Sequence, residues 1–132
     1  MLDVSNINTI LGLGENLPAI YLDAHQIQQV LVNLVTNAVQ AMSAGGTLFI
    51  GSRAGRKGES VEITVKDSGR GISPEFLPHI FDPFFSTKGD VGTGLGLSVS
   101  YGIIKNHKGE IRVESKPGVG TTFTIELPAN RN

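Results

Sequence analysis

The sequence predicts an α+β fold, a two-layer sandwich with helices packed on one face of a mixed, mostly antiparallel sheet. The chain has 132 residues, of which 39% are hydrophobic, so it can build one core and is expected to form one domain over residues 1–132. Most strand-like segments are joined as hairpins, and helical patterns lie between the hairpins instead of following every strand. This order disfavours a doubly wound parallel sheet.

The N-terminal part of the chain predicts two short strands and a long helix. Residues 7–13 and 18–22 are apolar segments on either side of a Gly/Glu/Asn turn. Asp23 then precedes a helical pattern, and Gln26 completes an approximate capping box. The pattern ends at a pair of glycines, residues 45–46. Its apolar residues have the spacing of a helix packed on a core: Ile27, Val30, Leu31, Leu34, Val35, Ala38, Val39 and Met42.

Two hairpins are expected in the remainder of the chain. Residues 47–52 and 60–66 are separated by a Gly/Arg/Lys turn, and the second segment alternates apolar and polar side chains. Residues 111–115 and 121–127 are joined by a turn that contains proline and glycine. Both pairs therefore predict antiparallel strands.

Between the hairpins, the sequence predicts a short helix, a loop and a second long helix. Ser73 and Pro74 are typical of a helix start, as cap and first helical residue. Residues 81–93 have no periodicity and are interpreted as a loop. Helical spacing returns over 95–106, and Gly109 is expected to close that helix.

Charge and cysteine content exclude several classes of function. Eleven Lys+Arg against twelve Asp+Glu give a net charge of -1, so nucleic acid is not expected as a partner. The absence of cysteine excludes disulfides, thiolate zinc sites and cysteine catalysis. No apolar run reaches the roughly 18 residues of a membrane span, and no signal peptide is evident, so a cytoplasmic location without direct membrane contact is expected. His25, His79 and His107 lack metal-ligand spacing and are expected at surface or cap positions.

The strongest motif is a cluster of glycines that leads into the second long helix. Four of the 17 glycines lie within eight residues, at Gly89, Gly92, Gly94 and Gly96. A glycine-rich segment at a helix start offers backbone N–H groups and the positive end of the helix dipole to an anion, as in a phosphate site. The motif differs from the dinucleotide fingerprint and from the P-loop. A flexible loop without function is the alternative.

Two further motifs contain polar residues suited to a nucleotide. Asn33 and Asn37 lie four residues apart on one side of the long helix, and carboxamide oxygens can ligate Mg2+. Asp67, Gly69 and Gly71 follow a strand directly, so the carboxylate can accept a hydrogen bond from an exocyclic amine such as that of adenine. Taken alone, each motif has a simpler interpretation: a solvated helix face for the asparagines and an ordinary turn for the aspartate.

Three of the six phenylalanines lie within five residues, at Phe81, Phe84 and Phe85. We expect these rings to fill the core and to anchor a mobile lid formed by the residues after them. Lys88, in that lid, would meet phosphate or remain in solvent.

Taken together and in this order, four blocks resemble the catalytic ATP-binding domain of sensor histidine kinases, within the superfamily that includes gyrase, Hsp90 and MutL. The blocks are similar to the N, G1, F and G2 boxes of that family, at residues 31–38, 67–72, 81–85 and 92–97. Residues 118–128 are similar to the usual ending of the family. The resemblance covers residues 23–128 and implies the Bergerat type of α/β sandwich, with ATP held between the long helix and the lid.

The resemblance also implies a role for individual residues. Asn37 would coordinate Mg2+, Asn33 would support the metal and phosphate network, and Asp67 would bind the adenine amino group. The remaining residues expected to bind the nucleotide are Gly69, Gly71, Ile72, Phe81, Gly92, Thr93, Gly94, Leu95, Gly96, Leu97 and Thr122, the last beside a water near Asp67.

The function implied is transfer of the γ-phosphoryl group from Mg-ATP to a histidine on a separate helical dimerisation domain, with a response regulator downstream. ATPase branches of the superfamily carry a glutamate at position 33, whereas Asn33 cannot act as a general base, so transfer is favoured over hydrolysis. Alternatives are a serine kinase of the anti-sigma-factor type and a non-catalytic ATP-sensing module. Because the phosphoacceptor and dimerisation helices are absent from the sequence, the isolated domain is expected to be a monomer that does not phosphorylate itself.

Overall fold

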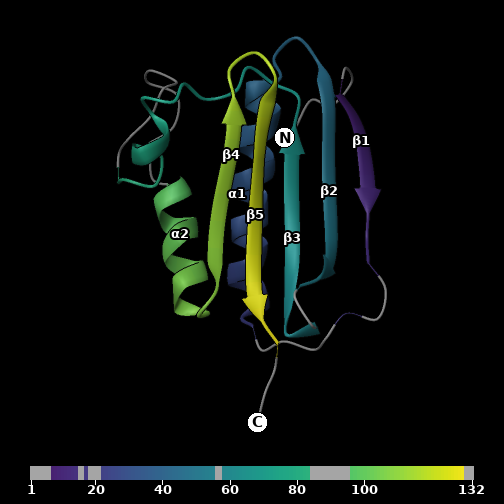
Figure 1. Cartoon of the computed structure of the whole chain (residues 1–132), viewed down its shortest axis with the longest axis vertical. Coiled ribbons are helices and arrows are strands. Elements are labelled where there is room, and N and C mark those ends of the chain that lie inside the picture. Colours follow the sequence, from purple (N-terminus) through teal and green to yellow (C-terminus); the bar gives the residue numbers. More distant parts are fainter. Residues whose placement is uncertain (1–6, 15–16, 18–21, 56–57, 84–95, 130–132) are drawn as a thin grey trace.

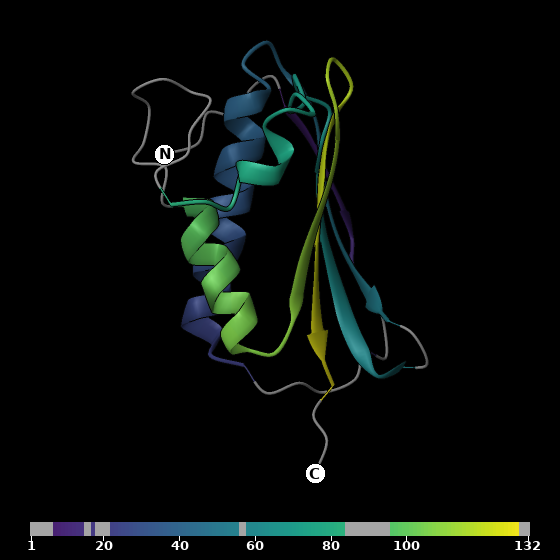
Figure 2. The same cartoon turned by 60° about the vertical axis from the view of Figure 1, so that its left-hand side comes forward.

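The computed structural model describes residues 7–14, 17, 22–55, 58–83 and 96–129. Their backbone forms one mixed five-stranded sheet, in the order β1-β2-β3-β5-β4, with the helices packed on one face (Figures 1 and 2). The strands are β1 (Ile7–Gly12), β2 (Gly46–Ala54), β3 (Ser60–Asp67), β4 (Glu110–Lys116) and β5 (Gly120–Pro128). The helices are α1 (Ala24–Ala41), the 3-10 helix η2 (Leu77–His79) and α2 (Gly96–Asn106). The predicted α+β sandwich is confirmed.

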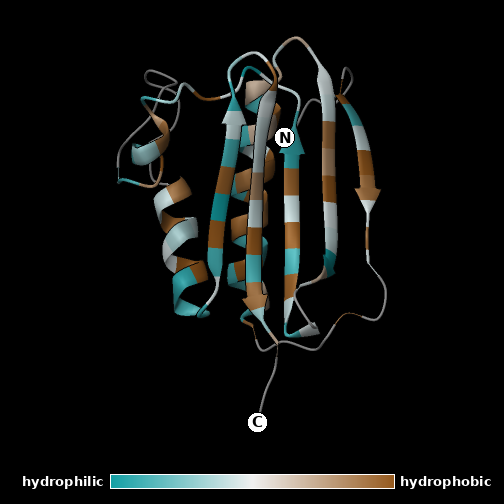
Figure 3. Ribbon diagram, viewed as in Figure 1, coloured by the Kyte–Doolittle hydropathy of each residue, from teal (hydrophilic) through white to brown (hydrophobic). Residues whose placement is uncertain are grey.

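The core lies between α1, α2 and the helix-facing side of the sheet. The most deeply buried large side chains come from both layers: Val30 and Leu34 of α1, Ile104 of α2, and Val65, Ile125 and Leu127 of the sheet. Apolar and polar residues alternate along β3, β4 and β5, as Figure 3 shows by colour. Since successive residues of a strand point to opposite faces, this alternation places one apolar face under the helices. No helix in the described ranges is long and apolar enough to cross a membrane.

The opposite face of the sheet is polar, which explains why the helices cover only one face. Arg112 forms ion pairs with Glu126 at 3.0 Å, Glu62 at 3.7 Å and Glu110 at 3.8 Å. Arg53 pairs with Glu62 at 2.9 Å. The arginine side chains of these pairs remain exposed to solvent, and their charge keeps this face of the sheet polar without a covering layer. Surface ion pairs contribute little to stability.

The two predicted hairpins are confirmed: β3 pairs antiparallel with β2, and β5 with β4. Of the two short strands predicted over residues 7–13 and 18–22, the first is confirmed as β1, which pairs in parallel with β2, from Ile7 beside Gly46 to Gly12 beside Gly51. Parallel neighbours need a long crossover, and α1 supplies it. Residues 18–21 lie outside the described residues, and Leu22 is not in a strand.

The predicted capping box at the start of α1 is half formed. Asp23 is the N-cap, and its Oδ1 accepts hydrogen bonds from the backbone N–H groups of His25 at 3.0 Å and Gln26 at 3.1 Å. The N–H of Asp23 itself donates to Nε2 of His107, at 2.9 Å, and not to the Gln26 side chain. A residue distant in sequence therefore replaces the expected local partner.

The predicted helix start at Ser73 and Pro74 is wrong. Residues 74–76 form a turn, in which the Ser73 carbonyl accepts from the backbone N–H groups of Phe76 and Leu77. The helical turn that follows is η2, and the proline in its first turn is Pro78. Ser73 Oγ bonds to Glu75 and caps no N–H group. Of the predicted loop over residues 81–93, only residues 81–83 are described, and they form a turn.

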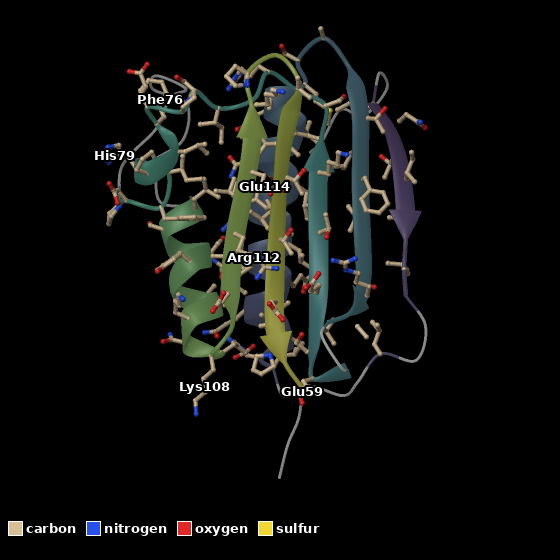
Figure 4. The ribbon with its side chains drawn as sticks, in the orientation of Figure 1. Glu59, Phe76, His79, Lys108, Arg112 and Glu114 are labelled. Atoms are coloured by element: carbon tan, nitrogen blue, oxygen red, sulfur yellow. The ribbon has the colours of Figure 1, made fainter. Side chains whose placement is uncertain are left out.

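The end of α2 also differs from the expectation. The residue with left-handed backbone is Lys108, with φ of 61°, and not Gly109. Hydrogen bonds from Lys108 N–H to the Lys105 carbonyl and from Gly109 N–H to the Ile104 carbonyl, both 2.9 Å, form a Schellman cap. Gly109 is required for space, because a Cβ there would lie 2.5 Å from the Glu126 carbonyl oxygen. Figure 4 shows Lys108 extending away from the fold at this connection.

The Lys108→Gly substitution is expected to raise the free energy of unfolding by about 0.5–1 kcal/mol, because glycine adopts left-handed backbone without steric cost. The matched control is Lys105→Gly, inside α2, which should lower it by about 1 kcal/mol. Urea denaturation of both variants measures the two changes. A decrease of equal size in both would contradict the assignment of Lys108 to the cap.

Candidate functional site

A stripe of α1 that borders its buried face connects the other parts of the candidate site. Asn33, Asn37 and Ala41 are four residues apart, so successive members are about 6 Å apart along the helix axis. The Asn33 side chain is bonded to the first turn of α2, and the Ala41 carbonyl accepts from Arg70 N–H at 3.1 Å. The half-buried Asn37 therefore lies between the start of α2 and the loop that follows β3.

Asn33 holds the start of α2. Its Nδ2 donates to the Gly96 carbonyl oxygen and to Ser100 Oγ, both at 3.2 Å. Ser100 is fully buried, and its hydroxyl donates to the same Gly96 carbonyl at 2.9 Å. Because these bonds engage the amide nitrogen of Asn33, they orient its carboxamide and position the first turn of α2 against α1.

Asp67 is a buried carboxylate at the end of β3. Its side chain is on the helix-facing side of the sheet and only 6% exposed, and its Oδ1 accepts from Gly69 N–H at 2.8 Å. Burial raises the pKa of Asp67, whereas backbone hydrogen bonds from Gly69 and Thr121 and the charge of Arg70 act in the opposite direction. A buried acid of this kind has a cost in stability, which is typical of a functional group.

The loop from Asp67 to Ile72 is braced by two neighbouring elements. A Cβ on Gly69 would collide with the backbone of Ala41, and a Cβ on Gly71, whose φ is 76°, would collide with the backbone of Lys116. The Arg70 carbonyl also accepts from Gly118 N–H at 2.8 Å. These glycines let the loop lie directly against α1 and the β4–β5 turn.

Ile72 is fixed by its backbone. Its N–H donates to Ser115 Oγ at 2.7 Å, and the Ile72 side chain packs against the core. Ser115 Oγ also lies 2.7 Å from Thr121 Oγ1 and donates to the Gly120 carbonyl. This short network links the loop after β3 to the β4–β5 hairpin.

The predicted role of Thr122 beside Asp67 disagrees with the register of the sheet. Asp67 is paired with Thr121, while Thr122 is paired with Lys66. Directly paired residues share a face and neighbours alternate, so Thr122 points to the polar face of the sheet, away from Asp67. The buried Thr121 is the threonine on the face of Asp67. The sequence alone does not show which of the two consecutive threonines faces Asp67, because that depends on a one-residue difference in register.

The structure places Phe81 and Leu97 in the packing around α2. The Phe81 ring is 5.2 Å from that of Tyr101 and 6.4 Å, edge to face, from that of Phe123, centroid to centroid. Leu97 packs against the core cluster. The predicted packing role of Phe81 is confirmed, and contact of either residue with a ligand stays a prediction.

Several predicted site residues lie outside the described residues. They are Phe84, Phe85, Lys88, Gly92, Thr93, Gly94 and Leu95. Gly96, the last glycine of the cluster, begins α2 and lies beside Asn33. Three residues of the site were missed by the sequence analysis, namely Ser100, Ser115 and Thr121, because a buried serine or threonine has no distinctive spacing.

Comparison with known proteins identifies this arrangement. The model of the family described as histidine kinase-, DNA gyrase B-, and HSP90-like ATPase matches residues 22–131. The chain belongs to this family. It is 42% identical to sporulation kinase E of Bacillus subtilis over 98% of the chain and 17% of that kinase. It is 45% identical to the sensor histidine kinase ZraS of Escherichia coli over 89% of the chain and 24% of that kinase.

The fold matches a solved member of the same group. The catalytic domain of the histidine kinase ThkA, in a nucleotide-free form, superposes with a TM-score of 0.80 and 37% identity, covering 96% of this chain and 82% of that one. The chain is thus a catalytic ATP-binding domain of the sensor histidine kinase type, as the motifs predicted. It spans less than a quarter of the length of the two curated kinases.

Asp67 is expected to give the domain a pH-dependent stability that an Asp67→Asn variant lacks. Because the pKa of Asp67 is raised on folding, the folded state binds more protons than the unfolded state between the ordinary value of 3.8 and the raised value. The free energy of unfolding of the wild type should therefore fall, relative to the variant, as pH rises through that window, and the difference should stay constant above it. Urea denaturation from pH 3 upward (about one step per half unit) measures this. If the free energy of unfolding of the wild type instead rose relative to the variant with increasing pH, the raised pKa of Asp67 would be contradicted.

Proposed function

We propose that this domain binds Mg-ATP between α1, the loop after β3 and the start of α2, and donates the γ-phosphoryl group to a histidine on a separate helical domain in two-component signalling. The observation that carries the proposal is the buried Asp67 carboxylate, held at the last residue of the central strand β3 beside the end of α1. Named relatives, a sporulation kinase and a sensor histidine kinase, support it.

The base-binding end of the site fits adenine. Asp67 offers a carboxylate acceptor in a buried place, where an unpaired polar group is costly and a matched one is selective. Adenine presents an exocyclic amine donor, whereas guanine presents a carbonyl acceptor at the corresponding position. Adenine is therefore the base that Asp67 favours, and the braced glycines Gly69 and Gly71 bring the loop backbone close to it.

The phosphate end of the site fits a metal-bound triphosphate. The first N–H groups of α2, at Gly96 and the residues after it, have no partner within a regular helix and favour an anion. Asn37, one turn from Asn33 and half-buried, offers a carboxamide oxygen of the kind that Mg2+ accepts. When bound, the metal would neutralise charge that develops on the transferred phosphoryl group.

Among the described residues, we assign roles in positioning the nucleotide and assign none as a nucleophile. Asn33 has no group that takes a proton at neutral pH and is engaged in holding α2, so it does not activate water. His107 uses both ring nitrogens in hydrogen bonds, and His79 pairs with Asp82 at 3.1 Å. His25 lies in the first turn of α1, eight residues before Asn33 and so about 12 Å from it along the helix. The acceptor histidine is therefore assigned to a separate helical domain, and a response regulator to the next step.

Asp67→Asn is expected to weaken ATP binding by at least about tenfold, the cost of losing a charged hydrogen-bond acceptor, without unfolding the domain. The control is Glu114→Gln, an exposed carboxylate on β4 (Figure 4), which should leave the affinity unchanged. Titration calorimetry with ATP, ADP and GTP measures this, and GTP should bind weakly to both proteins. Equal affinity of the wild type and Asp67→Asn for ATP would overturn the assignment of the pocket.

Phosphoryl transfer is tested by placing this domain where ZraS carries its matching region and supplying labelled Mg-ATP. Acid-labile phosphohistidine is expected, and Asn37→Ala should slow its formation roughly 100-fold, because a bound metal ion supplies several kcal/mol of charge stabilisation. Gln29→Ala, on the exposed face of α1, is the control. Acid-stable phosphoserine would instead support a serine kinase. ATP binding without phosphoryl transfer would support a non-catalytic sensing module.

A further inference from the structure

α1 and α2 are antiparallel neighbours, and hydrogen bonds join them at both ends of α2. Near the start of α2, Asn33 Nδ2 donates to the Gly96 carbonyl. Beyond its other end, His107 Nε2 accepts from Asp23 N–H. The joined residues are 10 positions apart on α1 and 11 on α2, which correspond to about 15 and 16.5 Å of helix. Because the two spans match, both bonds form without bending either helix.

The two hydrogen-bond partners of the His107 ring determine its tautomer. Its Nδ1 is 2.8 Å from the Ile103 carbonyl, which can only accept, so Nδ1 carries the proton. Its Nε2 is 2.9 Å from Asp23 N–H, which can only donate, so Nε2 is the unprotonated acceptor. Only the neutral imidazole with the proton on Nδ1 makes both bonds. The ring thus links the last turn of α2 to the backbone of the α1 cap.

The hydrogen bond between His107 and Asp23 fixes the position of α2 along the axis of α1, a direction in which apolar packing gives little resistance. α2 buries Ser100, Ile103 and Ile104 against α1 and the sheet, and such packing resists separation more than sliding along the axis. A hydrogen bond from a backbone N–H fixes the position of His107 along α1, whatever the rotamers of nearby side chains. The first turn of α2, at the other end of a rigid helix, is then fixed beside Asn33.

We infer that His107 is a positioning residue for the phosphate end of the nucleotide site, acting through α2 over the length of that helix. It fastens the end of α2 to the start of α1, and so sets where the N–H groups after Gly96 lie relative to Asn33 and Asn37. The inference rests on the proposed function, since it assigns a purpose to α2 that requires a bound triphosphate.

Substitutions at His107 separate its two hydrogen bonds. Gln has an amide oxygen near the place of Nε2 and can still accept from Asp23 N–H, whereas Asn reaches only the place of Nδ1. His107→Ala and His107→Asn are expected to bind ATP roughly 3- to 10-fold more weakly, the value of one net hydrogen bond. His107→Gln should stay within about twofold of the wild type. The control is His25→Ala, an exposed histidine in the first turn of α1.

Calorimetric titration of the four variants with ATP, together with imidazole nitrogen NMR of the free wild type, tests the inference. NMR should show the Nδ1-protonated neutral ring for His107, and slow exchange of the Asp23 amide hydrogen that is lost in His107→Ala. Equal ATP affinity of the wild type and His107→Ala would overturn the inference, as would equal affinities of the Gln and Asn variants or an Nε2-protonated ring. Failure of the wild type itself to bind ATP would instead overturn the proposed function. If His107→Ala does not fold, the comparison of ATP affinity between His107→Gln and His107→Asn still tests the inference.

Discussion

The burial of one face of α1 against the sheet is the interaction on which the candidate site depends. Val30 and Leu34 are almost completely buried, and Ala38 is small enough to let the helix lie close to the strands. Once this face is buried, the rotation of the helix is determined, and Asn33 and Asn37 must lie at its border. The same packing brings the end of α1 against the loop after β3, so the core and the candidate pocket are built by one contact.

The loop after β3 shows how a buried charge is kept in place. Asp67 is desolvated, which disfavours its ionised form and opposes folding at neutral pH. The surroundings compensate in part, through backbone hydrogen bonds from Gly69 and Thr121 and through the charge of Arg70. A rigid carboxylate whose burial is only partly compensated favours a ligand that donates a hydrogen bond to it. Asp67 is therefore expected to lower the stability of the fold while it raises the affinity for the ligand.

Asn33 and His107 show that the site is also a property of helix–helix packing. Each joins α1 to α2, one through a side-chain amide and one through an imidazole, at opposite ends of α2. The glutamate of the ATPase branches would have no donor for the Gly96 carbonyl, so an asparagine at position 33 serves the helix contact as well as removing a general base. The residues proposed to bind the nucleotide and the residues that pack the helices are therefore not separate sets in this domain.

The sequence by itself determined the two hairpins, the presence of both long helices, the start of α1 and the polar motifs, because helical spacing, strand alternation and N-cap chemistry are local properties. It also indicated the family, since four motifs in a fixed order carry more information than any one of them. Tertiary structure alone decided the parallel pairing of β1, the choice of Thr121 over Thr122 beside Asp67, and the partner of the Asp23 N–H. Each of these depends on which residue, distant in sequence, is paired with another. A strand register, or a contact between residues 84 positions apart, produces no periodic pattern in the sequence.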